Sequence, residues 1–411
     1  MKKRQLFVFI LAASVAAPVA ARAAKNSDKT PAVRFRFGGR LDAQIFTDSY
    51  ASKAANNGIF YYFPLAPVYN DRGEDLNREN SLRFGVANSR LSVRATAPNV
   101  LGGEAGAYVE ADFMGSGTNV GIFRLRHAYM SLDWKRSTLL IGQTNNLSVP
   151  EEVFPNTVAH GAGTPLNPQS RIPQVRFSHR FGERVRLTAA VGMYAGKQGE
   201  AQAYGLVPDF ALRLSVGRAT MISFSGAVKS IRPRNFTADS VRTTRRMAAF
   251  NASVFGLHTF GGGHKLTAFV MWGQDLSTLS MLGGYGPRLR EVEAGEPDYG
   301  YTATQTIATW LGFETKIMRG WQPGLLVGWT KNLGAGKPID LALASIPDKG
   351  IDWYFRLSPR LWYHFKPLSF GLEYMYSLAS WGSLFDDRYR PVQRHRNAQN
   401  HRITLLARFK F

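Results

Sequence analysis

Arginine recurs at every second position in several stretches of the sequence. A guanidinium group stays charged at any physiological pH, and its planar fork of donors fits a carboxylate or a phosphate. The chemistry that such residues could perform is the reversible recognition of anions. The arginines placed this way, which we take as the candidate site residues, are Arg34, Arg36, Arg40, Arg90, Arg94, Arg124, Arg126, Arg176, Arg180, Arg356 and Arg360.

Covalent catalysis finds little support in the sequence. There is no cysteine, and the motifs His-Glu-x-x-His, Gly-x-Ser-x-Gly and Gly-x-Gly-x-x-Gly are absent. The eight histidines are scattered without the spacing of metal ligands. We therefore expect no catalytic residue, metal or cofactor. A hydrolase site assembled from a serine, a histidine and an acid that lie far apart in the sequence stays open as an alternative.

The N-terminal segment is typical of a secretory signal peptide. Residues 2–4 are basic, residues 6–21 are almost wholly apolar, and Ala21 and Ala23 supply the small residues of a cleavage site. We expect residues 1–23 to be removed during export by the Sec pathway, which would lower the formal net charge from +22 to +18. The alternative is a membrane anchor, for which the apolar stretch is short.

Export changes the meaning of the positive charge. The expected counterions are small anions or the head groups of outer-membrane lipid and lipopolysaccharide, and not nucleic acid. No later segment offers the roughly 18 uninterrupted apolar residues of a membrane-spanning helix. A membrane β-barrel needs no such run, because its lipid-facing and lumen-facing side chains alternate. The composition of 45% hydrophobic residues, with 40 glycines, also suits many strands joined by turns.

Alternation identifies the elements that carry the arginines. In residues 402–411 the odd positions are apolar, and the even positions are polar or charged except for Leu406. Residues 33–45 and 353–366 repeat this pattern, which is that of a strand with one apolar face. These stretches run ten to fourteen residues, longer than the usual strand of a soluble sheet and long enough to cross a bilayer at a tilt.

The sequence therefore predicts an all-β fold: one antiparallel transmembrane β-barrel formed by residues 24–411, with short periplasmic turns and long external loops. We expect sixteen strands, which would leave an aqueous channel, with fourteen or eighteen as alternatives. The strands are expected near residues 33–46, 81–96, 103–114, 122–136, 137–143, 171–181, 185–195, 206–217, 219–232, 241–258, 263–275, 300–316, 320–332, 350–366, 368–382 and 398–411.

Two stretches break the alternation. Arg124 and Arg126 share one parity, whereas Ser131 and Asp133 take the other. The apolar residues of 82–86 and of 91–95 likewise differ in parity. A β-bulge would flip the phase in this way, and a wall buried in an oligomer interface would blur it. The sequence does not decide between the two.

The candidate arginines are expected to face the lumen of the barrel. Each would cost about 2–4 kcal/mol on the lipid face at the bilayer midplane. Rings of such residues select anions in a water-filled pore. The alternative is that wall carboxylates neutralise them, and the acids on the polar faces that could do so are Asp42, Glu110, Asp112, Glu314 and Glu373.

Residues 144–170 are the best candidate for a loop that folds into the pore and narrows it. This segment is rich in Pro, Gly and Asn, and it carries Glu151 and Glu152. Opposite an arginine-lined wall, these two acids would create a transverse field. An ordinary external loop is the alternative reading of the same segment.

Five short motifs give the sequence a family resemblance. In their order and spacing they resemble the DcaP-like trimeric outer-membrane porins and, more loosely, the phosphate-selective porins. They occupy residues 89–98, 110–112, 125–129, 142–144 and 173–177. The resemblance implies a sixteen-stranded homotrimer with a positively lined constriction that passes small anions such as dicarboxylates. Unlike that family, the sequence has too few residues in 25–32 for a helical extension. The terminal Phe411 also resembles the signal read by the barrel assembly machinery.

Together these features predict an outer-membrane porin of a Gram-negative bacterium that lets small hydrophilic solutes, preferentially anions, diffuse passively through an arginine-lined channel. We do not expect an enzyme. A barrel that acts through its loops, as an adhesin or structural protein, remains the alternative beside the hydrolase.

Overall fold

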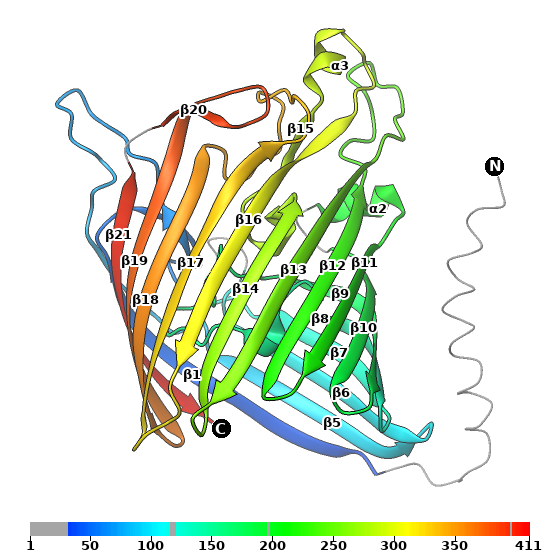
Figure 1. The fold of residues 1–411 in the computed structure, drawn as a ribbon, viewed down its shortest axis with the longest axis vertical. Helices are drawn as coiled ribbons and strands as arrows, with labels where there is room; N and C mark the ends of the chain where they lie inside the picture. The colour runs from blue at the N-terminus through cyan, green and yellow to red at the C-terminus, as the bar shows by residue number, and fades with distance from the viewer. Residues whose placement is uncertain (1–31, 116–120, 195–197, 395–396) are drawn as a thin grey trace.

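The computed structural model describes residues 32–115, 121–194, 198–394 and 397–411. They form a closed antiparallel β-barrel, in which β1 pairs with β21 to complete the wall (Figure 1). The predicted signal peptide, residues 1–23, lies outside the described residues, as does segment 25–31 ahead of the first strand. No helix among the described residues is long and apolar enough to cross a membrane.

Sixteen strands make up the wall, as the alternation predicts. The segments β4 and β5 pair one after the other with β1 and count as one interrupted strand. In chain order the wall consists of β1 (Arg34–Asp48), β4 (Ser81–Gly85) with β5 (Arg90–Val100), β6 (Gly103–Asp112), β7 (Arg124–Asp133), β8 (Ser137–Asn145), β9 (Arg171–Phe181), β10 (Val185–Gly192), β11 (Asp209–Gly217), β12 (Thr220–Ile231), β13 (Met247–Phe260), β14 (His264–Gln274), β16 (Tyr301–Glu314), β17 (Trp321–Ala335), β18 (Ile351–Phe365), β19 (Leu368–Phe385) and β21 (Ala398–Lys410).

Shorter elements lie in the connections between the wall strands. They are β2 (Ser52–Ala55), β3 (Phe60–Pro64), η1 (Glu151–Val153), α2 (Gly199–Gly205), η2 (Leu276–Leu279), β15 (Tyr285–Pro287), α3 (Leu289–Glu293) and β20 (Pro391–Arg394). These connections join the strands at one end of the barrel, and tight turns such as 182–184 and 261–263 join them at the other. Because barrels carry their long loops outside and their short turns in the periplasm, the long connections mark the external end.

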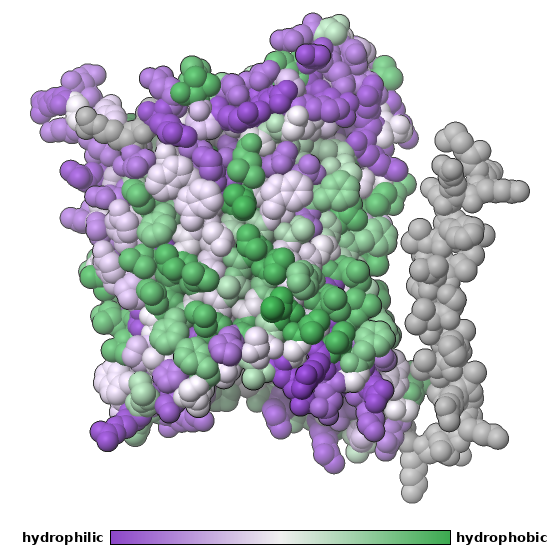
Figure 2. Space-filling view, in the orientation of Figure 1, coloured by the Kyte–Doolittle hydropathy of each residue, from purple (hydrophilic) through white to green (hydrophobic). Residues whose placement is uncertain are grey.

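The two faces of each strand match the predicted alternation. On β21, Ile403 and Leu405 point outward and are exposed, whereas Arg402 points inward with 2% of its surface exposed. The same division repeats around the wall and produces the apolar band on the outer surface in Figure 2. This band is the surface that a membrane barrel presents to lipid.

The two phase breaks have a structural cause. The register between β6 and β7 shifts by one residue at Glu110 and Ala111. This bulge reverses the parity of β7 after Arg126. Between β4 and β5, a turn at residues 86–89 inserts one extra residue against β1. Both breaks are therefore local insertions in the wall, the first of the two readings left open by the sequence.

Three external connections enter the barrel and fill part of its lumen. They are the hairpin β2–β3, the segment 146–170 and the segment around η2. Their apolar side chains, including Phe63, Leu166 and Leu282, pack with inward residues such as Trp310 and Tyr354 in one buried cluster. The barrel thus has a hydrophobic core inside its wall, which the strand number alone does not predict.

Candidate functional site

Arginines and carboxylates form a connected network on the inner face of β1 and its neighbours. Asp42 of β1 accepts a bidentate pair of hydrogen bonds from Arg408 of β21, at 2.7 and 2.9 Å. Arg40 lies 3.1 Å from the same carboxylate, and the Asn88 amide donates to it at 2.9 Å. One buried carboxylate is thus shared by two guanidinium groups.

A second node lies on β6. The Arg126 side chain, only 4% exposed, donates to Glu110 at 2.6 Å and to Asp112 at 2.8 Å. Arg124 donates to both oxygens of Asp112 at 3.0 and 2.8 Å. Arg90 approaches Glu110 at 3.3 Å. The bulge in β7 makes this node possible, because it turns Arg126 toward both acids of the neighbouring strand.

Arg171, the first residue of β9, joins this network without a partner of its own. Its guanidinium lies within electrostatic range of Arg126, Arg124 and Asp112. Its Nε is buried and makes no hydrogen bond within the described part of the chain. We call the group Arg40, Arg90, Arg124, Arg126, Arg171 and Arg408 the arginine cluster. It holds six guanidinium groups against the three carboxylates Asp42, Glu110 and Asp112.

The remaining candidate arginines do not join the cluster. Arg356 is 1% exposed and forms an ion pair of 2.7 Å with Glu373. Arg360 lies 3.8 Å from Glu314. Wall carboxylates therefore neutralise Arg356 and Arg360, which is the alternative that the sequence left open. Arg176 pairs with the loop residue Glu151 at 3.4 Å.

Four more candidates lie toward the periplasmic end of their strands. These residues, all exposed, are Arg34, Arg36, Arg94 and Arg180. Arg94 stacks over the ring of Tyr108 at 4.7 Å, and no carboxylate pairs with any of the four among the described residues. They could hold an anion near the periplasmic mouth of the barrel, away from the cluster.

Residues 146–170, which we call the crossing loop, span the lumen from the ends of β8 and β9 to strands about half a turn away around the wall. Glu373 of β19 accepts hydrogen bonds from the backbone N–H groups of Val158 and Ala159 at 2.5 and 3.1 Å. The Asn156 amide donates to Glu314 of β16 at 3.1 Å. The loop is therefore fastened to the wall at its far side.

The two acids of the crossing loop are both paired. Glu152 forms an ion pair of 2.9 Å with Arg213 of β11, which also donates to the carbonyl of Val149 at 2.7 Å. Glu151 contacts Arg176. These two acids fasten the near side of the loop to β9 and β11. They therefore anchor the loop, whether or not they also create a transverse field.

His160 lies in the crossing loop next to the cluster. Burial and the nearby guanidinium groups of Arg90 and Arg126 hold the pKa of His160 well below its ordinary value of 6.5. Its ring packs edge-on against Phe60 of the inward hairpin, with 5.5 Å between ring centroids. The folded protein thus keeps His160 neutral, which spares the cluster a further positive charge.

Acidification is expected to loosen the crossing loop. When the loop is released, His160 takes up a proton below about pH 6.5, whereas His160 in the docked loop excludes that proton. The docked state therefore keeps its full stability above about pH 6.5 and loses stability as the pH falls below it. Single-channel recordings in which current fluctuations grow from about pH 8 to pH 5 would show this. The variant His160→Asn should remove the dependence, and fluctuations that are equal at all pH values in the unmodified protein would contradict it.

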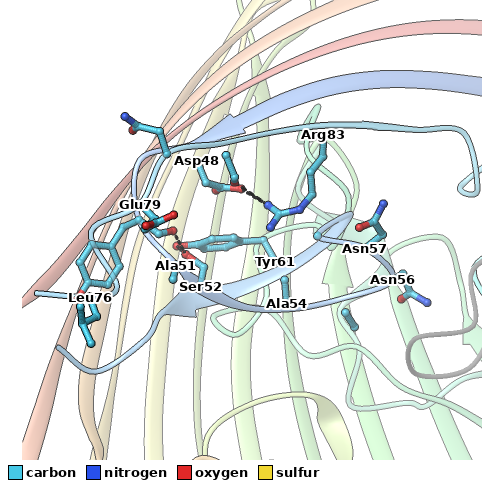
Figure 3. A pocket seen from close by; sticks show the side chains of 15 residues that line it. Asp48, Ala51, Ser52, Ala54, Asn56, Asn57, Tyr61, Leu76, Glu79 and Arg83 are labelled. Atoms are coloured by element: carbon cyan, nitrogen blue, oxygen red, sulfur yellow. Dashed lines mark hydrogen bonds and ion pairs between the residues drawn. The ribbon is translucent and has the colours of Figure 1, made fainter. Parts of the chain in front are cut away.

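A cavity of about 1040 Å³ opens at the external ends of β1 and β4 (Figure 3). Its lining includes Asp48 and Arg83, which lie 3.5 Å apart, together with Tyr61, Asn57 and Glu79. The inward hairpin β2–β3 supplies one side of it. The lining combines apolar, amide and charged side chains of both signs, and the cavity lies above the cluster along β1.

Sequence reasoning missed several of these residues. Arg171 lies where a loop meets a strand, so no alternation marks it. The inward hairpin has a clear signal in retrospect, because Phe60, Tyr61, Tyr62 and Phe63 are consecutive aromatics inside a connection that is otherwise polar. No group of three or more His, Asp or Glu residues is placed to hold a metal ion in the described ranges.

Comparison with known proteins agrees with this geometry. Residues 35–215 match the family described as DcaP outer membrane protein. The resemblance to DcaP-like porins is confirmed. The matched residues include β1 and β5 to β9, and therefore every member of the arginine cluster except Arg408. No protein of curated function matches the chain.

Solved porins share the fold of this DcaP-like barrel. The outer membrane channel DcaP of Acinetobacter baumannii gives a TM-score of 0.67 at 16% identity, over 92% of this chain and 97% of that one. An anion-selective porin from Comamonas acidovorans gives 0.59 at 10% identity, over 92% and 100%. The trimer form of OmpT from Vibrio cholerae gives 0.55 at 11% identity, over the same shares. The chain is thus an outer-membrane porin-like barrel, and the family model that it matches in part, together with its fold, favours a channel over an enzyme.

Proposed function

We propose that this barrel lets small anions diffuse passively across the outer membrane and prefers them to cations of the same size. The observation that carries the proposal is the arginine cluster, in which six guanidinium groups face three carboxylates. A surplus of fixed positive charge in a low-dielectric wall attracts anions and raises their local concentration.

The chemistry of the cluster suits dicarboxylates and phosphate-like anions. The side chains of Arg90 and Arg124 keep 20% and 34% of their surface exposed beside their contacts with Glu110 and Asp112. An anion with two carboxylates, or with several phosphate oxygens, can accept hydrogen bonds from two such groups at once. Monovalent cations meet a net repulsion at the cluster, because its guanidinium groups outnumber its carboxylates.

The crossing loop sets the width of the path in this proposal. Its Val153 and Leu166 pack in the hydrophobic core, whereas its His160 lies near the cluster. Solutes would enter through the cavity at the external end and pass beside the cluster to the exposed arginines near the periplasm. The family resemblance and the trimer form of OmpT support the further proposal that three copies assemble.

A liposome-swelling assay tests the proposal. Liposomes that contain the full-length mature protein should swell faster in disodium succinate or sodium phosphate than liposomes given a neutral sugar of similar size. Equal rates for the anions and the sugar, from liposomes with verified protein content, would contradict a preference for anions. If none of the solutes tested caused the liposomes to swell, that result would argue against a porin.

A further inference from the structure

A groove crosses the lipid-facing surface of strands β11 to β14. It has a volume of about 520 Å³ and an almost wholly apolar lining, which includes Leu212, Phe224, Gly226, Ala252 and Trp272. It lies outside the lumen and takes no part in the proposed conduction path. Grooves of this size on an otherwise packed barrel wall can receive a chain of apolar atoms.

The strand register explains why the wall is hollow here. Leu212, Gly226, Ala252 and Trp272 stand side by side in one outward-facing row across four strands. The two middle residues are the smallest available, and the two outer ones are large, so the row forms a notch. The row below it is filled by larger side chains, beginning with Leu214.

Two arginines lie beyond this notch along the same two strands. The last paired residues of β12 and β13 are Ile231 and Met247, so Arg232 and Arg246 oppose each other one step further. Arg232 follows the last residue of β12 and Arg246 precedes the first residue of β13. Alternation continued one step past these ends would place both on the side of Gly226 and Ala252, which faces lipid. Arg246 is exposed and makes no ion pair or hydrogen bond within the described residues. Arg232 stacks over Tyr204 at 5.3 Å and donates two hydrogen bonds to Asn235, which carries no charge, so its own charge is not neutralised there.

The vertical distance matches one leaflet of a membrane. Six residues separate the arginine pair from the notch along each strand. At about 3.3 Å per residue and a tilt near 40°, they span roughly 15 Å along the membrane normal. This is about half of the ~30 Å hydrocarbon core, and hence the depth that the acyl chains of one leaflet fill.

The arginine pair lies at the external end of the barrel. Residues 232–246 form one of the long connections, and β12 begins at the opposite end after the tight turn from β11. A lipid whose head group meets these arginines therefore belongs to the outer leaflet. In the outer membrane, the outer-leaflet lipid that carries phosphate groups above several acyl chains is lipopolysaccharide.

We propose that this surface is a binding site for one lipopolysaccharide molecule, with a phosphate of its lipid A at Arg232 and Arg246 and an acyl chain in the notch at Gly226 and Ala252. Charge complementarity selects the head group, and the groove selects the chain. The proposal depends on the outer-membrane location of the barrel. It does not depend on anion selectivity, so either proposal can fail while the other stands.

Native mass spectrometry of the detergent-solubilised, full-length mature protein tests the site. Titration with bis-phosphorylated lipid A should give a saturable complex, and lipid A without phosphates should bind roughly 30-fold more weakly, since each arginine near a membrane surface contributes about a factor of five. The double variant Arg232→Gln and Arg246→Gln should show the same loss. The matched control is Arg72→Gln with Arg78→Gln, which removes two exposed arginines from another external loop and should bind as the unmodified protein does.

A second pair of variants isolates the acyl chain. Ala252→Leu fills the notch and should weaken the binding of lipid A, whereas Ala189→Leu, on the lipid-facing side of β10 and outside the groove, should not. Heat-modifiable gel mobility verifies that each variant is folded. Equal affinity for the phosphorylated and dephosphorylated lipids, or unchanged binding in both the arginine and the Ala252 variants, would overturn the proposal.

Discussion

Replacing Arg40, Arg90 and Arg171 by glutamine is expected to abolish most of the anion preference of the channel. Each fixed charge contributes about 1 kcal/mol, a factor of about five, to a monovalent ion at contact distance in water. Three losses at contact distance should therefore lower the ratio of anion to cation permeability by roughly a hundredfold. The measurement is the reversal potential across a planar bilayer under a KCl gradient.

Replacing these three arginines leaves every carboxylate of the network with another guanidinium partner. Asp42 retains its ion pair with Arg408, and Glu110 retains its ion pair with Arg126. Arg171 forms no ion pair within the described residues, so its replacement leaves no carboxylate without a partner. Replacing Arg126 instead would remove a contact from both Glu110 and Asp112. Its effect on selectivity could then not be separated from its effect on folding.

The control for this variant removes the same charge elsewhere. Arg136→Gln, Arg184→Gln and Arg319→Gln change three exposed arginines in the periplasmic turns. This triple variant should keep the reversal potential of the unmodified channel. If the two triple variants behave alike, the arginine cluster does not determine ion preference.

Removing Glu373 is expected to release the crossing loop and destabilise the barrel at the same time. The variant Glu373→Ala leaves Arg356 buried without a counter-charge, which typically costs about 3–5 kcal/mol. It also deprives the N–H groups of Val158 and Ala159 of their acceptor. The temperature at which the folded band disappears in a heat-modifiable gel should fall, and single-channel currents should become noisier.

A double variant separates the two effects. Glu373→Leu with Arg356→Met replaces the buried ion pair by apolar groups, a change that is often neutral or stabilising. Thermal stability should recover in this variant, but the noisy current should persist because the loop still lacks its acceptor. A quiet current in both variants would show that Glu373 does not hold the loop.

The wall of this barrel was predictable from the sequence because one physical constraint acts on every residue of it. Lipid on one side of each strand and polar groups on the other impose an alternation of apolar and polar residues with a period of two. This alternation locates all sixteen strands and predicts that Arg356, Arg402 and Asp42 point into the barrel. Even the phase breaks near Arg126 could be located, although only the structure identifies them as insertions.

The interior was less predictable because long-range contacts decide it. Period two places Arg90 and Arg356 on the same kind of face, but only the register and the crossing loop show that Glu373 neutralises one while the other joins a cluster with surplus charge. The inward hairpin and the segment at η2 lie in connections that carry no regular pattern. Their aromatic and aliphatic residues, such as Phe63 and Leu282, are the signal that these loops are buried.

We propose that the arginine cluster makes this outer-membrane barrel a channel for anions. The most direct test is the reversal potential of the unmodified, full-length mature protein in a planar bilayer with a KCl gradient. We expect stepwise openings and a reversal potential whose sign shows that chloride crosses more readily than potassium. A sign that favours potassium, or the absence of any conductance from protein shown to be folded, would contradict it.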